Sequence, residues 1–156
     1  MLIATPKRWF SWDFEVHEGG GQPVGDVRVS AWRERGAITV GGIEYPVTRG
    51  ALLSGVVTLS DVGGVLARAV KPSAFRRAFT LEHDGKEYVL KATSAWGRNF
   101  ALLDGEVQIG AVRPARLFGR QARADLPEDM PLEVRLFAIW LTLMLWKRQQ
   151  QAANSS

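Results

Sequence analysis

The chain of 156 residues contains no cysteine. Disulfides, thiolate zinc sites and a cysteine nucleophile are therefore excluded, and the composition is compatible with a reducing compartment. Residues 1–16 also lack the uninterrupted apolar core that a signal peptide places after its basic start. We therefore expect a cytoplasmic protein.

Recognisable catalytic and metal-binding motifs are also missing. The glycine-rich stretch EGGGQP at 18–23 lacks the Gly-Lys-Ser/Thr ending of a phosphate loop, and no Gly-x-Ser-x-Gly elbow occurs. His17 and His83 have no second histidine at ligand spacing, and the acidic cluster between Asp125 and Glu133 lacks the alternation of a calcium loop. We expect no catalytic residue, no metal and no cofactor, although catalytic residues dispersed over loops would leave no motif.

The remaining composition is ordinary for a globular domain. Apolar residues make up 46% of the chain and charged residues 23%, and the length suits a single hydrophobic core. We interpret residues 1–150 as one domain and the polar residues 151–156 as a disordered tail.

The chain repeats with a period of about 43 residues. GGIEYPV at 41–47 is echoed by DGKEYVL at 84–90, with a glycine, a glutamate and a tyrosine at matching places. A second series consists of VGDV at 24–27, VLARA at 65–69 and IGAV at 109–112. Such regular spacing indicates a repeated supersecondary unit.

Each unit is typical of four short strands joined by glycine-bearing turns. The expected strands lie at 12–16, 24–32, 37–40 and 43–48 in the first unit, at 55–60, 64–70, 76–83 and 86–94 in the second, and at 99–105, 107–118 and 119–126 in the third. Many short strands at near-even spacing predict an antiparallel barrel or sandwich of eleven or twelve strands.

The end of the chain predicts one helix over about 131–150, with Asp129 as its cap and Pro131 in its first turn. Its apolar side chains cover every side, so the helix must be buried all round. The residues expected in this helical core are Leu136, Phe137, Ile139, Trp140, Leu141, Leu143, Met144, Leu145 and Trp146.

A membrane or a barrel interior could bury this helix. Residues 136–146 would extend about 16 Å, against about 30 Å of hydrocarbon, and a longer span would carry Glu133 and Arg135 into the bilayer. A closed barrel of eleven or twelve strands has room for a helix along its axis. We therefore predict a mainly β fold, a closed antiparallel barrel of about twelve strands in three four-strand repeats around a buried C-terminal helix, with no transmembrane span. A tail anchor is the alternative.

The repeats VGDV, VLARA and IGAV, the paired GIEYPV and GKEYVL, and the closing DLPEDMPLEVRLFAIWLTLMLWKR together resemble the tubby C-terminal-like superfamily. That superfamily includes tubby proteins, LURP-one-related proteins and phospholipid scramblases. The resemblance covers nearly the whole chain and implies a twelve-stranded barrel that encloses a C-terminal helix. It also implies association with lipids or membrane surfaces.

The formal net charge is +4, and the repeat predicts where the charges gather. If successive strands run up and down, alternate turns lie at opposite barrel ends, one acidic and one basic. The candidate anion-binding or lipid-binding residues are Arg33, Arg35, Lys71, Arg76, Arg77, Arg113, Arg116 and Arg120. The alternative is that these side chains are solvated and only maintain solubility.

Four of the six tryptophans, Trp9, Trp12, Trp32 and Trp96, fall near strand ends or loops. We expect these rings to plug the barrel mouth, and contact with a lipid interface is the alternative, for which Trp32 and Trp96 are the candidates.

These patterns favour a non-enzymatic barrel that binds an anionic surface or ligand, best matched by phospholipid head groups, through a basic barrel end. Such a protein would be peripheral to a membrane. The alternative is a protein-interaction or scaffold module without lipid binding. A nucleic-acid partner is disfavoured because no sheet shows stacking aromatics interleaved with basic residues.

Overall fold

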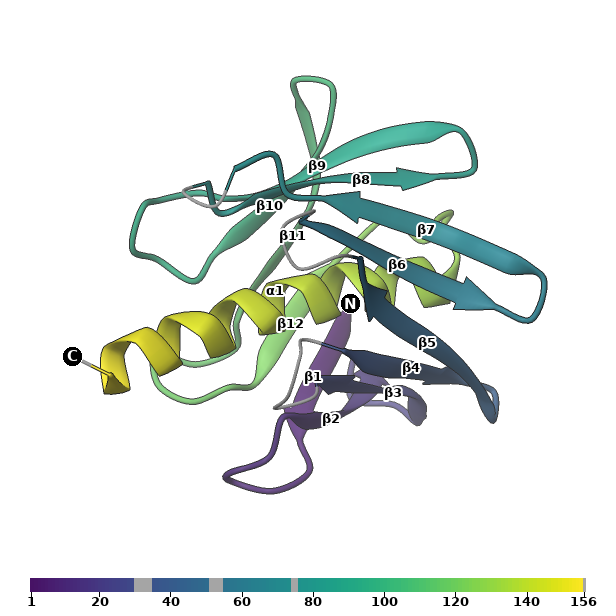
Figure 1. The fold of residues 1–156 in the computed structure, drawn as a ribbon. Helices are drawn as coiled ribbons and strands as arrows, with labels where there is room; N and C mark the ends of the chain where they lie inside the picture. Colours follow the sequence, from purple (N-terminus) through teal and green to yellow (C-terminus); the bar gives the residue numbers. More distant parts are fainter. Residues whose placement is uncertain (30–34, 51–54, 74–75, 156) are drawn as a thin grey trace.

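The computed structural model describes residues 1–29, 35–50, 55–73 and 76–155. Twelve antiparallel strands form a closed barrel, and one helix, α1 (Leu132–Asn154), runs through it (Figure 1). Each strand pairs with its neighbours in the sequence, and β1 closes the ring against β12. The predicted fold class is confirmed.

The first two repeats each supply four strands. The first repeat contains β2 (Asp13–Glu18), β3 (Pro23–Val29), β4 (Gly36–Val40) and β5 (Ile43–Arg49). The second contains β6 (Val56–Asp61), β7 (Gly64–Val70), β8 (Ala78–His83) and β9 (Lys86–Ala92). Register shifts follow Val16, Leu59 and Leu102, which are spaced 43 residues apart. The repeat in the sequence is therefore also a repeat of backbone geometry.

The third repeat is completed by the start of the chain. It contains β10 (Phe100–Asp104), β11 (Val107–Pro114) and β12 (Ala122–Asp125), and its fourth strand is β1 (Leu2–Pro6). Leu2 pairs with Ala124 on one side and with Glu18 on the other. The sequence patterns did not predict β1, and this strand raises the count from eleven to twelve.

The barrel interior is filled by alternate strand residues and by the helix. Phe79 and Leu81 of β8 are fully buried, as are Leu90 of β9 and Leu102 of β10. These side chains belong to the same apolar cluster as the helix residues from Leu136 to Trp146. All nine predicted helical core residues are buried, so the reading of an all-round apolar helix as a barrel core is confirmed.

Two details of the predicted helix are wrong. Pro131 is the N-cap and no side chain caps the helix, so Asp129 does not have the predicted capping role. The helix also continues to Asn154, whereas residues 151–156 were expected to be a disordered tail. In the described part of the chain, no helix is both long and apolar enough to cross a bilayer.

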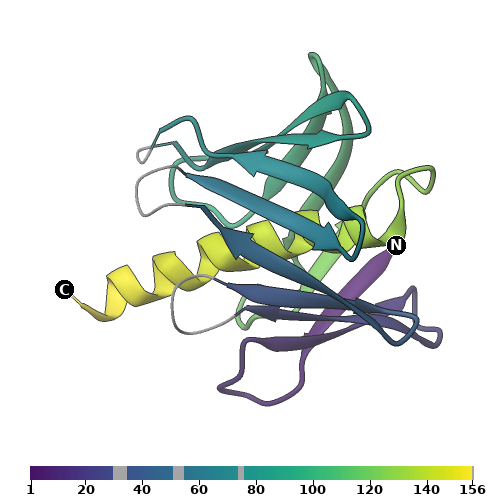
Figure 2. The same ribbon diagram turned by 45° about the vertical axis from the view of Figure 1, so that its right-hand side comes forward.

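The up-and-down strand order places alternate loops at opposite ends of the barrel. We call one the acidic end; it carries the hairpin turns, for example Asp84 and Gly85, which both have positive φ. The other, the basic end, carries the β1–β2, β3–β4, β5–β6, β7–β8, β9–β10 and β11–β12 loops. The helix enters at the acidic end and leaves through the basic end, where the chain ends (Figure 2).

Candidate functional site

The basic end concentrates positive charge. The cationic residues in its described loops are Lys7, Arg8, Arg35, Lys71, Arg76, Arg77, Arg98, Arg116 and Arg120, and the helix adds Lys147 and Arg148. No residue is acidic in the portions of these loops that the structure describes. The turns and flanking strand ends of the acidic end instead carry Glu18, Glu44, Asp61, Asp84, Glu87, Asp104 and Glu106, with Lys86 opposing them. The chain thus has a charge dipole along the barrel axis.

Several predicted site residues lie in the loops of the basic end with their side chains in solvent. Arg35, Arg76 and Arg116 are exposed there, and Lys71 is half-buried at the start of the β7–β8 loop. Arg33 and Trp32 lie outside the described residues. Exposed cations at one end are what long-range attraction to an anionic partner requires.

Arg113 does not lie in a loop of the basic end. It is on β11, opposite Arg123 in the register with β12, and its Nη2 lies 3.8 Å from Oδ2 of Asp125. Its side chain is on the outer wall of the barrel, where a carboxylate offsets its charge. Arg113 is the last residue but one of β11, which ends at Pro114, so it lies on the barrel wall next to the basic end rather than in one of its loops.

Arg77 and Arg120 hold neighbouring loops in place. Arg77, the last residue of the β7–β8 loop, donates through Nη1 to the backbone oxygens of Ala95 (3.2 Å) and Gly97 (2.7 Å), and through Nη2 to Gln149 of α1 (3.3 Å). Its guanidinium also lies 5.4 Å from the centre of the Phe100 ring. These contacts tie the β9–β10 loop to the helix.

Arg120, in the β11–β12 loop, makes similar contacts two loops further around the basic end. It donates to the backbone oxygens of Arg8, Trp9 and Ser11 in the β1–β2 loop. Its guanidinium stacks 5.2 Å from the Trp12 ring centre. Desolvation lowers the pKa of the Arg77 and Arg120 guanidinium groups, as expected for cations taken partly out of water.

Arg98 connects the loop that Arg77 binds to the loop that carries Arg120. From the β9–β10 loop it donates to the backbone oxygens of Leu117 (2.9 Å) and Gly119 (2.6 Å) in the β11–β12 loop. Its guanidinium lies 5.2 Å from the Trp146 ring centre. Arg77, Arg98 and Arg120 therefore form a relay in which each loop's arginine binds the carbonyl groups of the next loop. We call these three residues the arginine relay.

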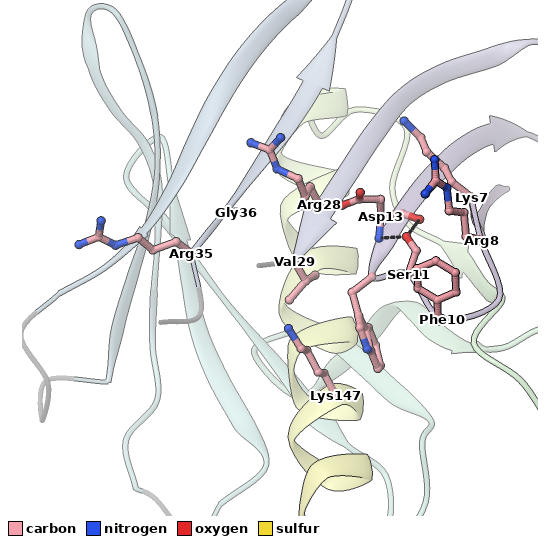
Figure 3. Close-up of a pocket in the computed structure, with 11 residues that line it drawn as sticks. Lys7, Arg8, Phe10, Ser11, Asp13, Arg28, Val29, Arg35, Gly36 and Lys147 are labelled. Carbon is pink, nitrogen blue, oxygen red and sulfur yellow. Dashed lines mark hydrogen bonds between the residues drawn. The ribbon is translucent and has the colours of Figure 1, made fainter. Parts of the chain in front are cut away.

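A cleft of about 780 Å³ opens at the basic end between the β1–β2 loop, the adjoining ends of β3 and β4, and the helix (Figure 3). Its basic lining residues are Lys7, Arg8, Arg28, Arg35 and Lys147, and Asp13 is its acidic one. Lys7 pairs with Asp26 at 2.8 Å and Arg28 with Glu44 at 3.3 Å, so these two charges are partly neutralised.

Lys147 gives the cleft a cationic floor. This helix residue is only 7% exposed, and its Nζ lies 6.0 Å from the Trp12 ring centre. Figure 3 shows its side chain rising from α1 between the two walls of the cleft, whereas Arg35 points away from the other labelled residues. An anionic group that enters here would meet Lys147 below and Arg8 at the rim.

The tryptophan prediction is correct for one ring and wrong for two. Trp12 is half-buried and packs 6.0 Å from Phe14, so it helps to close the barrel mouth. Trp9 and Trp96 instead stand in solvent, 88% and 87% exposed. Neither ring fills the barrel mouth, because each is almost entirely exposed to solvent.

Sequence reasoning also missed exposed apolar residues in two loops of this end. Phe10 is 59% exposed, and Leu117 and Phe118 are each 83% exposed. A signal was present: Arg8-Trp9-Phe10 and Arg116-Leu117-Phe118 share one pattern, an arginine followed by two large apolar residues inside a turn.

A search for metal-binding chemistry finds no group of three histidine or acidic residues, within the described ranges, that could hold an ion. Comparison with protein-family models gives no match, and neither the curated proteins nor the solved structures give a significant one.

Proposed function

We propose that this chain is a non-enzymatic barrel of the tubby C-terminal-like type that binds anionic phospholipid head groups at a membrane surface through its basic end. The twelve-stranded barrel around a C-terminal helix supports the family assignment. The separation of charge between the two barrel ends supports the function, because it would turn the basic end toward a negatively charged bilayer.

The basic end offers two kinds of cation for this purpose. Arg8, Arg76 and Arg116 are exposed in three loops and would contact phosphates across the surface. Lys147 lies at the floor of the cleft and would receive a head group that enters it. The arginine relay would remain in its structural contacts.

Co-sedimentation with vesicles tests the proposal. The protein should bind vesicles that contain phosphatidylserine, bind phosphatidylcholine vesicles weakly, and dissociate as salt concentration rises. Replacing Arg8, Arg76 and Arg116 together with glutamine should lower the affinity about tenfold or more, since each cation near the surface contributes about 1 kcal/mol.

A control with the same change in net charge separates position from total charge. Arg68, Lys91 and Arg123 are exposed on the outer wall of the barrel. Their replacement with glutamine should weaken vesicle binding much less than the loop triple variant. Equal losses in the two triple variants, or binding that ignores ionic strength, would contradict the proposal. A protein that binds no vesicles would favour the protein-interaction alternative.

A further inference from the structure

The exposed apolar residues of the described chain fall into two groups. At the acidic end and its adjoining strands these side chains are aliphatic: Met1, Ile43, Val62, Val65 and Val107. At the basic end they are Trp9, Phe10, Trp96, Leu117 and Phe118, so every exposed Trp or Phe in the described ranges lies in a loop of this end. We call these five residues the apolar tips.

The apolar tips are neighbours in the barrel. They come from the β9–β10, β11–β12 and β1–β2 loops, which follow one another around the ring because β12 pairs with β1. They therefore occupy one side of the basic end. Arg8 and Arg116 each directly precede an apolar pair, and both of these side chains are exposed.

We propose that the apolar tips insert into the interfacial layer of a bilayer while Arg8 and Arg116 bind lipid phosphates beside them. This inference rests on the proposed function and specifies how the basic end engages the membrane. Tryptophan and phenylalanine favour the bilayer interface, and arginine can extend its charged group to the phosphates while its stem lies against apolar groups.

The arginine relay makes this insertion less costly. A loop that enters an apolar layer carries backbone carbonyl groups, and each one left without a hydrogen bond there costs free energy. The relay satisfies carbonyl groups at the tips themselves, since Arg120 binds Trp9 O and Arg98 binds Leu117 O. Arg77 similarly binds Ala95 O, beside Trp96.

A bilayer fits this surface better than a protein partner does. The apolar tips lie on three separate loops and have exposed cations beside them. An interface with anionic lipid requires this combination, whereas the centre of a protein interface is depleted of charge. The consequence is an orientation: the basic end, with the C-terminal end of α1, faces the membrane, and the acidic end faces away.

Quenching of tryptophan fluorescence by brominated lipid tests the insertion directly. Wild-type protein bound to vesicles of phosphatidylserine and brominated phosphatidylcholine should be quenched. The tryptophan variants are made in a Trp32→Phe background, because that residue belongs to the β3–β4 loop of the same end. In this background, Trp9→Phe with Trp96→Phe should still bind but lose most of the quenching, because Trp140 and Trp146 are buried in the core and Trp12 is half-buried.

A pair of double variants tests the energetic role. Replacing Leu117 and Phe118 with serine removes two apolar tips and should lower vesicle affinity about tenfold or more, given about 25 cal/mol per Å² of apolar area inserted. The control variant, Val62→Ser with Val107→Ser, removes exposed apolar residues from the acidic end and should bind within about twofold of wild type. All four positions are exposed, and circular dichroism should confirm folding in both variants.

The outcomes separate this inference from the proposed function. Wild-type protein could bind vesicles in a salt-sensitive way without any quenching, and the Leu117 and Phe118 variant could bind equally well. That result would mean adsorption by charge alone. It would overturn insertion and leave the proposed function intact. Absence of any binding by wild-type protein would refute both. Quenching that disappears with the two tryptophans, together with a specific loss in the Leu117 and Phe118 variant, would establish insertion.

Discussion

The indole Nε1 of Trp140 donates a hydrogen bond of 2.9 Å to the backbone oxygen of Arg28, and this bond ties the central helix to β3. Gly36 of β4 packs against the same two groups: a Cβ at this position would overlap both the Arg28 oxygen and the Trp140 indole. The barrel wall and the helix therefore meet here without room for a side chain.

Gly36→Ala is expected to destabilise the fold, because the added methyl group must displace either a strand or the largest fully buried side chain. The loss in the free energy of unfolding should be about 1–3 kcal/mol or more, measured by urea denaturation. Gly63→Ala is the control, since its Cβ would meet only the end of the Asp61 side chain. Similar losses at both positions would contradict the close packing of helix and wall.

Leu141→Asp should abolish folding. Leu141 is fully buried on the barrel axis, and an unpaired carboxylate there costs several kcal/mol, comparable to the stability of a whole domain. The same substitution at Gln150, which is exposed on the same helix, should leave thermal unfolding nearly unchanged. A folded Leu141→Asp protein would refute the central position of the helix.

Arg120→Gln should lower stability, whereas Arg116→Gln should lower vesicle affinity, although the two residues lie in one loop. Loss of the Arg120 guanidinium leaves the carbonyl groups of Arg8, Trp9 and Ser11 without their donor and should lower the unfolding free energy by about 1–3 kcal/mol. Arg116 is exposed, so its replacement should leave stability nearly unchanged and reduce affinity for anionic vesicles. Two variants that are equally stable would show that the relay does not hold the loops.

Stability at the acidic end should depend on the protonation of His17. Its Nδ1 lies 3.1 Å from the Gly21 oxygen and its Nε2 lies 2.6 Å from Oε1 of Glu15. The hydrogen bond to Gly21 contributes most, followed by that to Glu15, and together they raise the pKa of His17 above the usual 6.5. Protonated His17 is therefore favoured in the folded state. Its contribution is fully present below the unfolded pKa and is lost as pH rises through the higher folded value.

His17→Gln should accordingly destabilise the protein more at about pH 5 than at about pH 9. Urea denaturation of both proteins at the two pH values measures the difference. A loss that is the same at both values would show that the two hydrogen bonds do not favour the charged imidazole.

The sequence alone determined the elements whose signals are local. Alternating strands, glycine turns and the 43-residue repeat predicted β2 to β12, and the apolar surface of α1 required a barrel wide enough to enclose it. The repeat also placed the loop charges, because up-and-down order assigns alternate turns to alternate ends. These inferences need only local residue patterns, the repeat spacing and the number of strands.

The tertiary structure decided what depends on contacts between distant residues. Leu2–Pro6 is not followed by a glycine-bearing turn, since residues 7–12 contain no glycine, so the sequence pattern did not mark it as a strand. It becomes β1 because the edges of β2 and β12 are both unpaired without it. Arg77 and Arg120 look like any other loop arginines in the sequence. Their partners are backbone oxygens, which every residue carries, so only the folded loops determine which carbonyl groups come within reach of each guanidinium and which arginines remain in solvent.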